Sequence, residues 1–146
     1  MRSSDNGKIW SKPKDITGQV LIKQDGTFLG VAPGVGLTTH KGRVIMPLYV
    51  DRKQTVSIYS IDDGENWHRM AGHPYAENVD EWQMVQAPSG AIIGLGRAKR
   101  YGKTPMSISY DDGKTWINAG KTDLYAPKCQ KSVISIGDYV FLLASQ

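Results

Sequence analysis

Short segments in which apolar and polar residues alternate recur along the chain. Two clear examples are residues 55–60 and 105–110, which are rich in β-branched and apolar side chains. A spacing of two is typical of strands with one buried face. The 16 glycines spread through the sequence indicate frequent turns between such segments. The pattern therefore predicts an all-β protein.

A repeated motif joins these predicted strands. The pattern Ser-x-Asp-x-Gly-x-x-Trp occurs around Asp5, Asp62 and Asp111, at intervals of about fifty residues, which is typical of repeat architectures. Asp accepts hydrogen bonds from nearby backbone N–H groups and Gly adopts positive φ, so each copy predicts a tight hairpin turn. The Trp should open the next strand and pack between sheets. We expect the three aspartates to be structural and not catalytic.

The order of strands and turns predicts units of four antiparallel strands. The expected strands are residues 36–39, 43–50, 54–61 and from 67; then 81–87, 91–98, 104–110 and from 116; then 130–136 and 139–144. We expect one incomplete propeller, in which residues 1–19 end a blade, 20–76 and 77–122 are full blades, and 123–146 begin another. A propeller closes a ring of roughly four to eight blades, so the remainder of the ring is the first expected partner.

Composition and charge exclude several classes of function. The net charge is +4 but the basic residues are scattered, which favours a solvated basic face and no nucleic-acid partner. The apolar stretches are far shorter than the ~20 residues of a membrane span. Cys129 is the single cysteine and the three histidines lack ligand spacing, so we expect no metal. The glycine pairs at 34–36 and 94–96 lack the third glycine of a nucleotide loop, and no cofactor is implied.

One pair of residues points to chemistry. Ser89 lies in a predicted turn, midway between Glu81 and Arg97. Residues equidistant from a hairpin turn face each other, so this carboxylate and guanidinium should be neighbours within one residue of register. They would lie on the inner strands of a blade, at the end opposite the turn, where a ligand pocket can form. The alternative is an ordinary cross-strand ion pair worth ~0.2–1 kcal/mol.

Several motifs together resemble the sialidase family. The three repeats resemble its Asp box, which other propellers share, and residues 81–85 (EWQMV) resemble its Glu-x-Gln-Val-Val before a turn and a strand ending in Arg. Residues 32–36, 42–47 and 127–132 are similar to its Gly-Pro-Gly-x-Gly, Gly-Arg-Leu-Val-x-Pro and Pro-x-Cys-Gln-x-Ser. The likeness covers nearly the whole chain in the family's order. It departs at Ala32, at Trp82, where smaller residues are usual, and at residues 94–96, where Asn often precedes the Arg.

The resemblance implies a six-bladed exo-α-sialidase of glycoside hydrolase family 33, which cleaves terminal sialic acid with retention. Its nucleophile is a tyrosine, because a carboxylate would meet the substrate's own carboxylate. Glu81 matches the glutamate that activates this tyrosine, and Arg97 matches one of three arginines that bind the substrate carboxylate. The family's other catalytic residues would lie outside residues 1–146, so the resemblance implies that this chain alone is inactive. It also implies a secreted or cell-surface location.

Two other functions remain open at this point. One is a lectin-like propeller that binds sialic acid without cleaving it, which a missing tyrosine or acid/base aspartate in the full-length protein would favour. The other is an Asp-box propeller of different function, such as a glucanase or an interaction scaffold. The Glu81 and Arg97 hairpin argues against the second, because such proteins need no carboxylate clamp.

Overall fold

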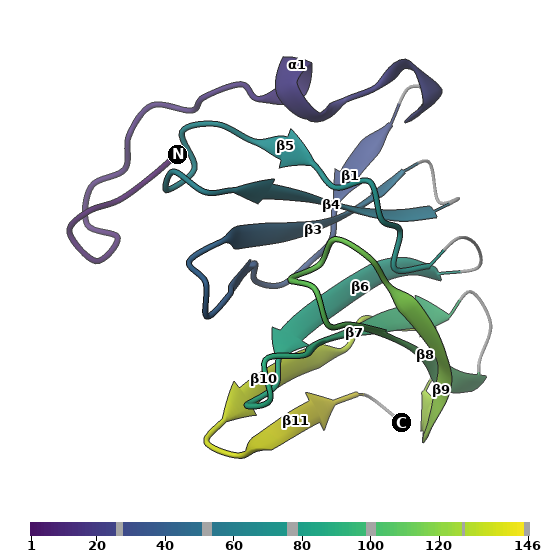
Figure 1. The fold of residues 1–146 in the computed structure, drawn as a ribbon. Helices are drawn as coiled ribbons and strands as arrows, with labels where there is room; N and C mark the ends of the chain where they lie inside the picture. Colours follow the sequence, from purple (N-terminus) through teal and green to yellow (C-terminus); the bar gives the residue numbers. More distant parts are fainter. Residues whose placement is uncertain (26–27, 51–53, 76–78, 99–101, 127, 145–146) are drawn as a thin grey trace.

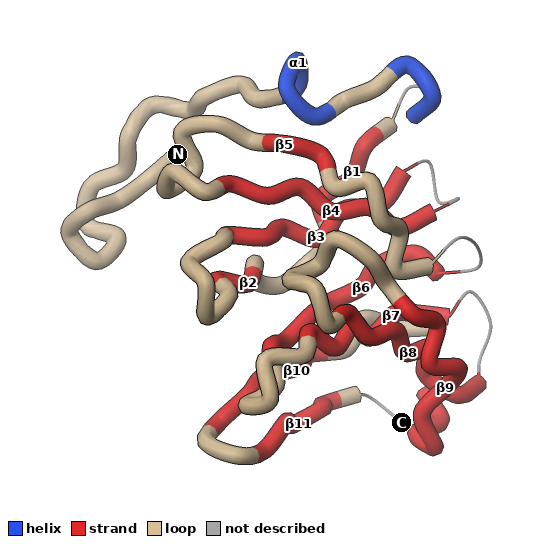
Figure 2. Tube along the Cα trace, viewed as in Figure 1, coloured by secondary structure: helices blue, strands red, loops and turns tan. Residues whose placement is uncertain are grey.

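The computed structural model describes residues 1–146 except 26–27, 51–53, 76–78, 99–101, 127 and 145–146. Within the described residues, strands and loops account for most of the chain (Figure 2). The helical turns α1 (Thr17–Val20) and η1 (Lys23–Asp25) lie between the N-terminal segment and the first strand. The all-β class that the sequence predicts is confirmed.

The first sheet is built around β3 (Val44–Val50), which pairs antiparallel with β4 (Gln54–Ser60) along its whole length. The short strand β5 (His68–Arg69) pairs with the other side of β4. Two short strands share the remaining edge of β3. They are β1 (Leu29–Val31), next to the end of β3, and β2 (Leu37–Thr38), next to its start.

This divided inner edge differs from the single strand predicted at residues 36–39. Pro33 has no backbone N–H to donate to β3, and Gly34 has a φ of 112°, so the chain leaves the ladder between β1 and β2. A Cβ on Gly34 would lie 1.9 Å from Nε2 of Gln83. The glycine therefore also admits a side chain from the second sheet. That contact is invisible to a local pattern, which explains the missed strand.

The second sheet has the order β6–β7–β8–β9, and each strand is antiparallel to the next. A two-stranded hairpin, β10–β11, follows it in the chain. The strands predicted for this part are all present, with ends that shift by a few residues. Their bounds are β6 (Val79–Gln86), β7 (Ile92–Ala98), β8 (Gly102–Ser109), β9 (Ile117–Ala126), β10 (Ser132–Ile136) and β11 (Tyr139–Leu143).

The first sheet, the second sheet and the hairpin follow one another as stacked layers (Figure 1). A core lies between the first and second sheets and another between the second sheet and the hairpin, while a third covers the opposite face of the first sheet. Burial of these side chains holds the layers together. The three cores are, in that order, Ala32, Ile45, Met70, Tyr75, Val79, Trp82, Met84 and Ile92; Val85, Leu95 and Val133; and Val20, Leu48, Val50, Val56 and Ile58.

The tight turn predicted at each repeat is present, and in the second and third copies it joins two antiparallel strands. In the second copy, the Ser60 hydroxyl donates to Asp62 Oδ1 at 2.7 Å and accepts from the Gly64 N–H at 2.9 Å, while the Asn66 N–H donates to Asp62 Oδ1 at 2.9 Å. The copies around Asp5 and Asp111 repeat these bonds. The two central turn residues have positive φ, as in a type I′ turn; they are Asn6 and Gly7, Asp63 and Gly64, and Asp112 and Gly113.

The tryptophans of the repeats differ in burial. Trp67 and Trp116 precede β5 and β9 and pack against the cores, as predicted. Trp10 is 58% exposed, which contradicts the prediction for the first copy. No strand of the described residues flanks this turn, so the indole has no sheet to pack on and only donates to the Gly7 carbonyl at 3.0 Å.

The Asp62 carboxylate should make the fold sensitive to acid. Hydrogen bonds from the Asn66 backbone, the Asn66 side chain and Ser60 lower the pKa of Asp62 to about 2. A lowered pKa stabilises the fold above the unfolded value of about 3.9, and the contribution disappears as pH falls toward 2. We expect Asp62→Asn to lower the urea midpoint at pH 7, and we expect the difference from wild type to shrink between pH 4 and pH 2.

The neighbouring Asp63→Asn variant is the matched control. Asn tolerates the positive φ at this position, and the same charge is removed one residue away. Its urea midpoint should stay close to that of wild type at pH 7 and throughout the range from pH 4 to pH 2. An Asp62→Asn difference of constant size across this pH range would contradict the assignment.

Candidate active site

Glu81 and Arg97 lie together at the open end of the β6–β7 hairpin. The regular ladder runs from Gln86 opposite Ile92 to Trp82 opposite Gly96, so the same register leads on to Glu81 and Arg97. Arg97 Nη1 donates to Glu81 Oε2 at 3.2 Å. The prediction that Glu81 and Arg97 are neighbours across the hairpin is therefore confirmed.

A β-bulge follows directly after this ladder. The pair beyond Trp82 and Gly96 is Val79 opposite Ala98, so Asp80 and Glu81 share the space opposite Arg97. A bulge of this kind re-aims side chains and bends its strand. Here the consecutive residues Asp80 and Glu81 both line one cavity with Arg97, which strict alternation along a strand would not allow.

Arg97 is held from a second side. Its Nε donates to the Lys128 carbonyl at 2.9 Å, in the segment that leads into β10. The side chains of Arg97 and Glu81 are only 29% and 26% exposed, so their interaction is screened less than that of a surface pair. A guanidinium has five N–H donors in a planar fork. The donors that Glu81 and Lys128 do not use remain for a ligand carboxylate.

A cavity of about 160 Å³ opens at this point between the first and second sheets, lined by Tyr49, Asp80, Glu81 and Arg97. Tyr49, on β3, lies opposite Gly30, where a Cβ would be 2.5 Å from the Tyr49 ring. Oδ1 of Asp80 is buried and has no hydrogen-bond partner among the described residues. The lining thus combines a cation with carboxylate acceptors, and it suits a small anionic molecule that also offers hydrogen-bond donors.

Lys131 is 6% exposed and belongs to the segment before β10, whose Lys128 carbonyl accepts from Arg97. Its Nζ donates to the Cys129 carbonyl at 3.2 Å. Burial lowers the pKa of Lys131 below its usual range; the nearby Cys129 opposes that change, Arg97 adds to it by repulsion, and Glu81 opposes it by attraction. A buried ammonium therefore shares the electrostatic environment of the pair.

Tyr49, Asp80 and Lys131 were not predicted as site residues. Asp80 could not be predicted, because strict alternation along a strand places it on the face opposite Glu81. The β-bulge that brings both residues to one cavity is not marked in the local sequence. Tyr49 lies in a predicted strand of another sheet. Of the three, only Lys131 could have been selected from the sequence, because it falls within residues 127–132, which carry one of the family-like motifs.

Trp82 follows Glu81 in β6 and packs in the core between the first and second sheets. It is 1% exposed, its Nε1 donates to the Leu48 carbonyl at 2.8 Å, and its ring meets Trp116 edge-on at 5.6 Å between centroids. A Cβ on Gly94 would come within 3.4 Å of both indole rings. The large Trp82 and the glycine on the neighbouring strand therefore compensate each other, which accounts physically for two departures from the family pattern.

The Gln83 side chain connects the first sheet, the second sheet and the β10–β11 hairpin by hydrogen bonds. Its Nε2 donates to the Pro33 carbonyl of the loop before β2 at 2.9 Å, and its Oε1 accepts from the Val133 N–H of β10 at 3.2 Å. The side chain is 5% exposed, so both of its polar groups are satisfied inside the protein. This arrangement fixes β6, the strand that carries Glu81, between its neighbours.

The aspartates of the repeats lie away from the cavity. Ser60, at the start of the second repeat, pairs with Val44 at the end of the sheet opposite Tyr49. Ser109 pairs with Ile92 at the turn end of β7, far along the strand from Arg97. Asp5, Asp62 and Asp111 instead accept hydrogen bonds within their own turns.

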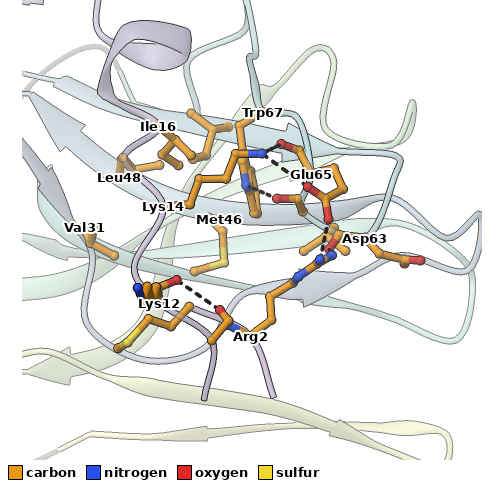
Figure 3. Close-up of a pocket in the computed structure, with 15 residues that line it drawn as sticks. Arg2, Lys12, Lys14, Ile16, Val31, Met46, Leu48, Asp63, Glu65 and Trp67 are labelled. Carbon is orange, nitrogen blue, oxygen red and sulfur yellow. Dashed lines mark hydrogen bonds and ion pairs between the residues drawn. The ribbon is translucent and has the colours of Figure 1, made fainter. Parts of the chain in front are cut away.

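A separate hollow of about 590 Å³ lies between the N-terminal segment and the first sheet (Figure 3). Its floor is apolar, with Met46, Leu48 and Trp67 among the lining residues, and Arg2 and Lys14 bridge its edge by pairing with Glu65. An apolar sheet face of this kind needs a packing partner. Glu81 and Arg97 do not line this hollow.

Two searches of the described residues bear on other kinds of site. None of the helices among them is long and apolar enough to cross a membrane. Histidine, cysteine and carboxylate side chains do not gather in groups of three or more that could bind a metal ion in the part of the chain that the structure describes.

Antiparallel sheets stacked face to face, with repeated Ser-x-Asp-x-Gly turns at one end and a polar cavity at the other, define a β-propeller of the Asp-box class. The family model for the BNR repeat-like domain matches residues 1–146. The chain therefore belongs to the BNR repeat-like family.

Its relatives are sialidases. The chain is 33% identical over 142 residues to a sialidase of Bacteroides fragilis, covering 92% of this chain and 25% of that protein. It is 25% identical over 151 residues to sialidase-4 of Mus musculus, covering 90% and 31%. The chain spans about a quarter to a third of the length of these relatives.

Solved structures agree with this assignment. The Hadza microbial sialidase Hz136 superposes with a TM-score of 0.82 at 30% identity, covering 92% of this chain and 27% of that one. The intramolecular trans-sialidase of Ruminococcus gnavus, solved with oseltamivir carboxylate, gives 0.76 at 29% identity, covering 90% and 28%. The sialidase-like propeller fold predicted from the sequence is confirmed. In the described residues the sheets do not close into a ring.

Proposed function

We propose that the chain forms part of the substrate site of an exo-α-sialidase that hydrolyses terminal sialic acid from glycoconjugates with retention. The observation that carries this proposal is the Glu81 and Arg97 pair, held at 3.2 Å on a bulge and exposed to a cavity. Free sialic acid and sialylated glycans carry the carboxylate that a guanidinium fork binds best.

In this proposal Arg97 binds the substrate carboxylate and Glu81 is the base. A tyrosine attacks the anomeric carbon, because a neutral phenol is not repelled by the substrate carboxylate. As this bond forms, the glycosidic bond breaks and the family's acid/base aspartate protonates the departing alcohol, while Glu81 accepts the phenolic proton. Water, activated by the same aspartate, then displaces the tyrosine, which takes its proton back from Glu81. The 146 residues alone would then be inactive, since the family's remaining arginines, acid/base aspartate and nucleophile have no match in this chain. The family default of a secreted or cell-surface protein is part of the same proposal.

The test is sialic acid binding by the protein that carries this sequence, compared with Arg97→Ala and Arg97→Lys. Truncating one partner of a desolvated charge pair costs roughly 2 kcal/mol or more, so the Kd of Arg97→Ala should rise by roughly 30-fold or more. Arg97→Lys should recover only part of this, because an ammonium cannot form the bidentate pair. Isothermal titration calorimetry measures both.

Arg43→Lys is the matched control for this experiment. Arg43 pairs with Asp112 at 3.1 Å, away from the cavity, so its replacement should leave the Kd unchanged. If Arg97→Ala binds sialic acid as tightly as wild type, the pair is an ordinary cross-strand ion pair. If wild type binds but cleaves no sialoside, the protein is instead a sialic-acid-binding propeller.

A further inference from the structure

The Gln83 side chain is connected to Arg97 by a series of contacts that leaves β6 and returns to it. Gln83 Oε1 accepts from the Val133 N–H of β10 at 3.2 Å. Five residues earlier in the chain, the Lys128 carbonyl accepts from Arg97 Nε at 2.9 Å. Arg97 Nη1 in turn donates to Glu81 Oε2 at 3.2 Å, and Glu81 lies two residues from Gln83 on β6. The segment from Lys128 to Val133 is therefore bonded at both ends to the hairpin that carries the pair.

This segment is short and braced from within. Lys131 is buried, and its Nζ donates to the Cys129 carbonyl at 3.2 Å. Val133 is also buried, in the core between the second sheet and the hairpin. Close-packed interiors transmit displacements from one group to the next. A shift at Val133 is therefore expected to move the Lys128 carbonyl as well.

The direction of the Arg97 guanidinium depends on that carbonyl. Arg97 lies just before the end of β7, where a bulge interrupts the pairing with β6. Its side chain is 29% exposed, so packing alone does not fix it. Because a guanidinium is planar, hydrogen bonds at Nε and at Nη1 together define its plane and the direction of its remaining donors. Without the Lys128 contact, these donors could turn away from a ligand carboxylate.

The other half of the Gln83 amide is held by the first sheet. Its Nε2 donates to the Pro33 carbonyl at 2.9 Å, and a Cβ on Gly34 would lie 1.9 Å from this nitrogen. The amide is thus bonded at both of its polar groups and closely packed. It presents Oε1 to the Val133 N–H in one fixed direction.

We propose that Gln83 is a positioning residue that, through the segment from Lys128 to Val133, aims the Arg97 guanidinium at the substrate carboxylate. Gln83 does not line the cavity, so it acts through this segment and not by contact with the substrate. The inference rests on the proposed function, in which Arg97 binds that carboxylate. It gives a role in substrate binding to an amide that is buried in the interior.

The first test is sialic acid binding by Gln83→Met, measured by calorimetry with the protein that carries this sequence. Methionine is unbranched and flexible and has no amide, so it fills the space while both hydrogen bonds are lost. The Kd should rise by roughly 3- to 10-fold, which is within the range of couplings in one hydrogen-bond network. The rise should be smaller than in Arg97→Ala, because the guanidinium is still present.

Gln86→Met is the matched control on the same strand. The Gln86 amide accepts from the His40 N–H at 2.7 Å and donates to the Gly90 carbonyl at 2.8 Å, at the turn end of the hairpin. Both variants leave two backbone groups without their partner, so both should lower the urea midpoint. Only Gln83→Met should weaken binding. An equal rise of the Kd in both variants would reduce Gln83 to a general support of the fold.

A double-mutant cycle asks whether the effect passes through Arg97. In the Arg97→Ala background, Gln83→Met should change the Kd by less than about twofold, because no guanidinium remains to be aimed. If the two effects multiply instead, Gln83 influences binding by another route and the proposal is wrong.

A further measurement needs no ligand. The Arg97 Nε–H can be observed by NMR with ¹⁵N-labelled arginine and assigned by its loss in Arg97→Lys. Its exchange with water should be faster in Gln83→Met than in wild type, because the bond to the Lys128 carbonyl opens more often. Exchange in Gln86→Met should match wild type. An unchanged rate in Gln83→Met would overturn the proposal whatever the binding result.

The outcomes separate this inference from the function on which it rests. A wild-type protein that does not bind sialic acid overturns the proposed function, and the role of Gln83 in it. A wild-type protein that binds sialic acid, with Gln83→Met binding it as tightly, leaves the function intact and overturns only the positioning role.

Discussion

Under the proposed function, replacing Glu81 by Gln in the protein that carries this sequence should lower kcat on a sialoside by roughly 10²–10⁴-fold, while sialic acid binding stays within a few-fold of wild type. The amide has nearly the same shape and keeps an oxygen that can accept from Arg97 Nη1, so the clamp geometry is retained. It has no basicity, and a positioned general base contributes roughly 10²–10⁴-fold to a reaction rate. Steady-state kinetics with a fluorogenic sialoside, together with calorimetric binding, would measure the two effects separately.

Glu65→Gln is the matched control for this prediction. Glu65 pairs with Arg2 and Lys14 at the hollow beside the first sheet, so its replacement should leave kcat unchanged. Full turnover by Glu81→Gln would rule out Glu81 as the base. A large loss of sialic acid binding in this variant would instead show that Glu81 acts mainly by holding Arg97.

Trp82→Ala should lower the free energy of unfolding by about 3–5 kcal/mol, which is the range for truncating a fully buried large aromatic residue. The indole packs edge-on against Trp116 and Tyr75 and donates to the Leu48 carbonyl, so the substitution removes contacts with both sheets. Because Gly94 has no side chain to fill the space, the cavity should persist. Urea denaturation followed by far-ultraviolet circular dichroism would measure the change.

Two further variants test the source of this loss. Trp82→Phe keeps most of the aromatic volume and removes the hydrogen bond to Leu48, so its cost should be smaller, about 1–3 kcal/mol. Trp10→Ala, at an exposed indole, should change stability far less than Trp82→Ala. A cost below about 1 kcal/mol for Trp82→Ala would mean that the layers are held together elsewhere.

The parts of the fold that could be predicted are those whose causes are local. The Asp-x-Gly turns have positive φ at Asp63 and Gly64 and at the equivalent positions, and nearly all of their hydrogen bonds lie within eight residues. Alternation then located β4 and β8. The division of the inner edge into β1 and β2 was not predicted, although Pro33 and Gly34 interrupt the ladder locally. The Gln83 side chain that packs against this break comes from about fifty residues further along the chain, beyond any local pattern.

The candidate site divides in the same way. Glu81 and Arg97 could be brought together by counting from the turn, because a regular antiparallel ladder preserves that symmetry. Asp80 lines the site because a β-bulge interrupts the regular pairing of β6 with β7. Tyr49 lines it because the first sheet packs on the second, and no pattern within a single strand contains that information.

The hydrogen bonds of Gln83 also limit which segments of this protein can be exchanged with those of a related protein. The single Gln83 amide bonds the loop before β2 on one side and β10 on the other. A segment containing β6 could therefore not be exchanged by recombination as an independent module. A functional chimera would have to inherit Gly34 with its neighbouring carbonyl and the start of β10 from the same parent. Although the repeats look interchangeable in sequence, the crossover points that preserve the β6–β7 hairpin lie outside this three-layer unit.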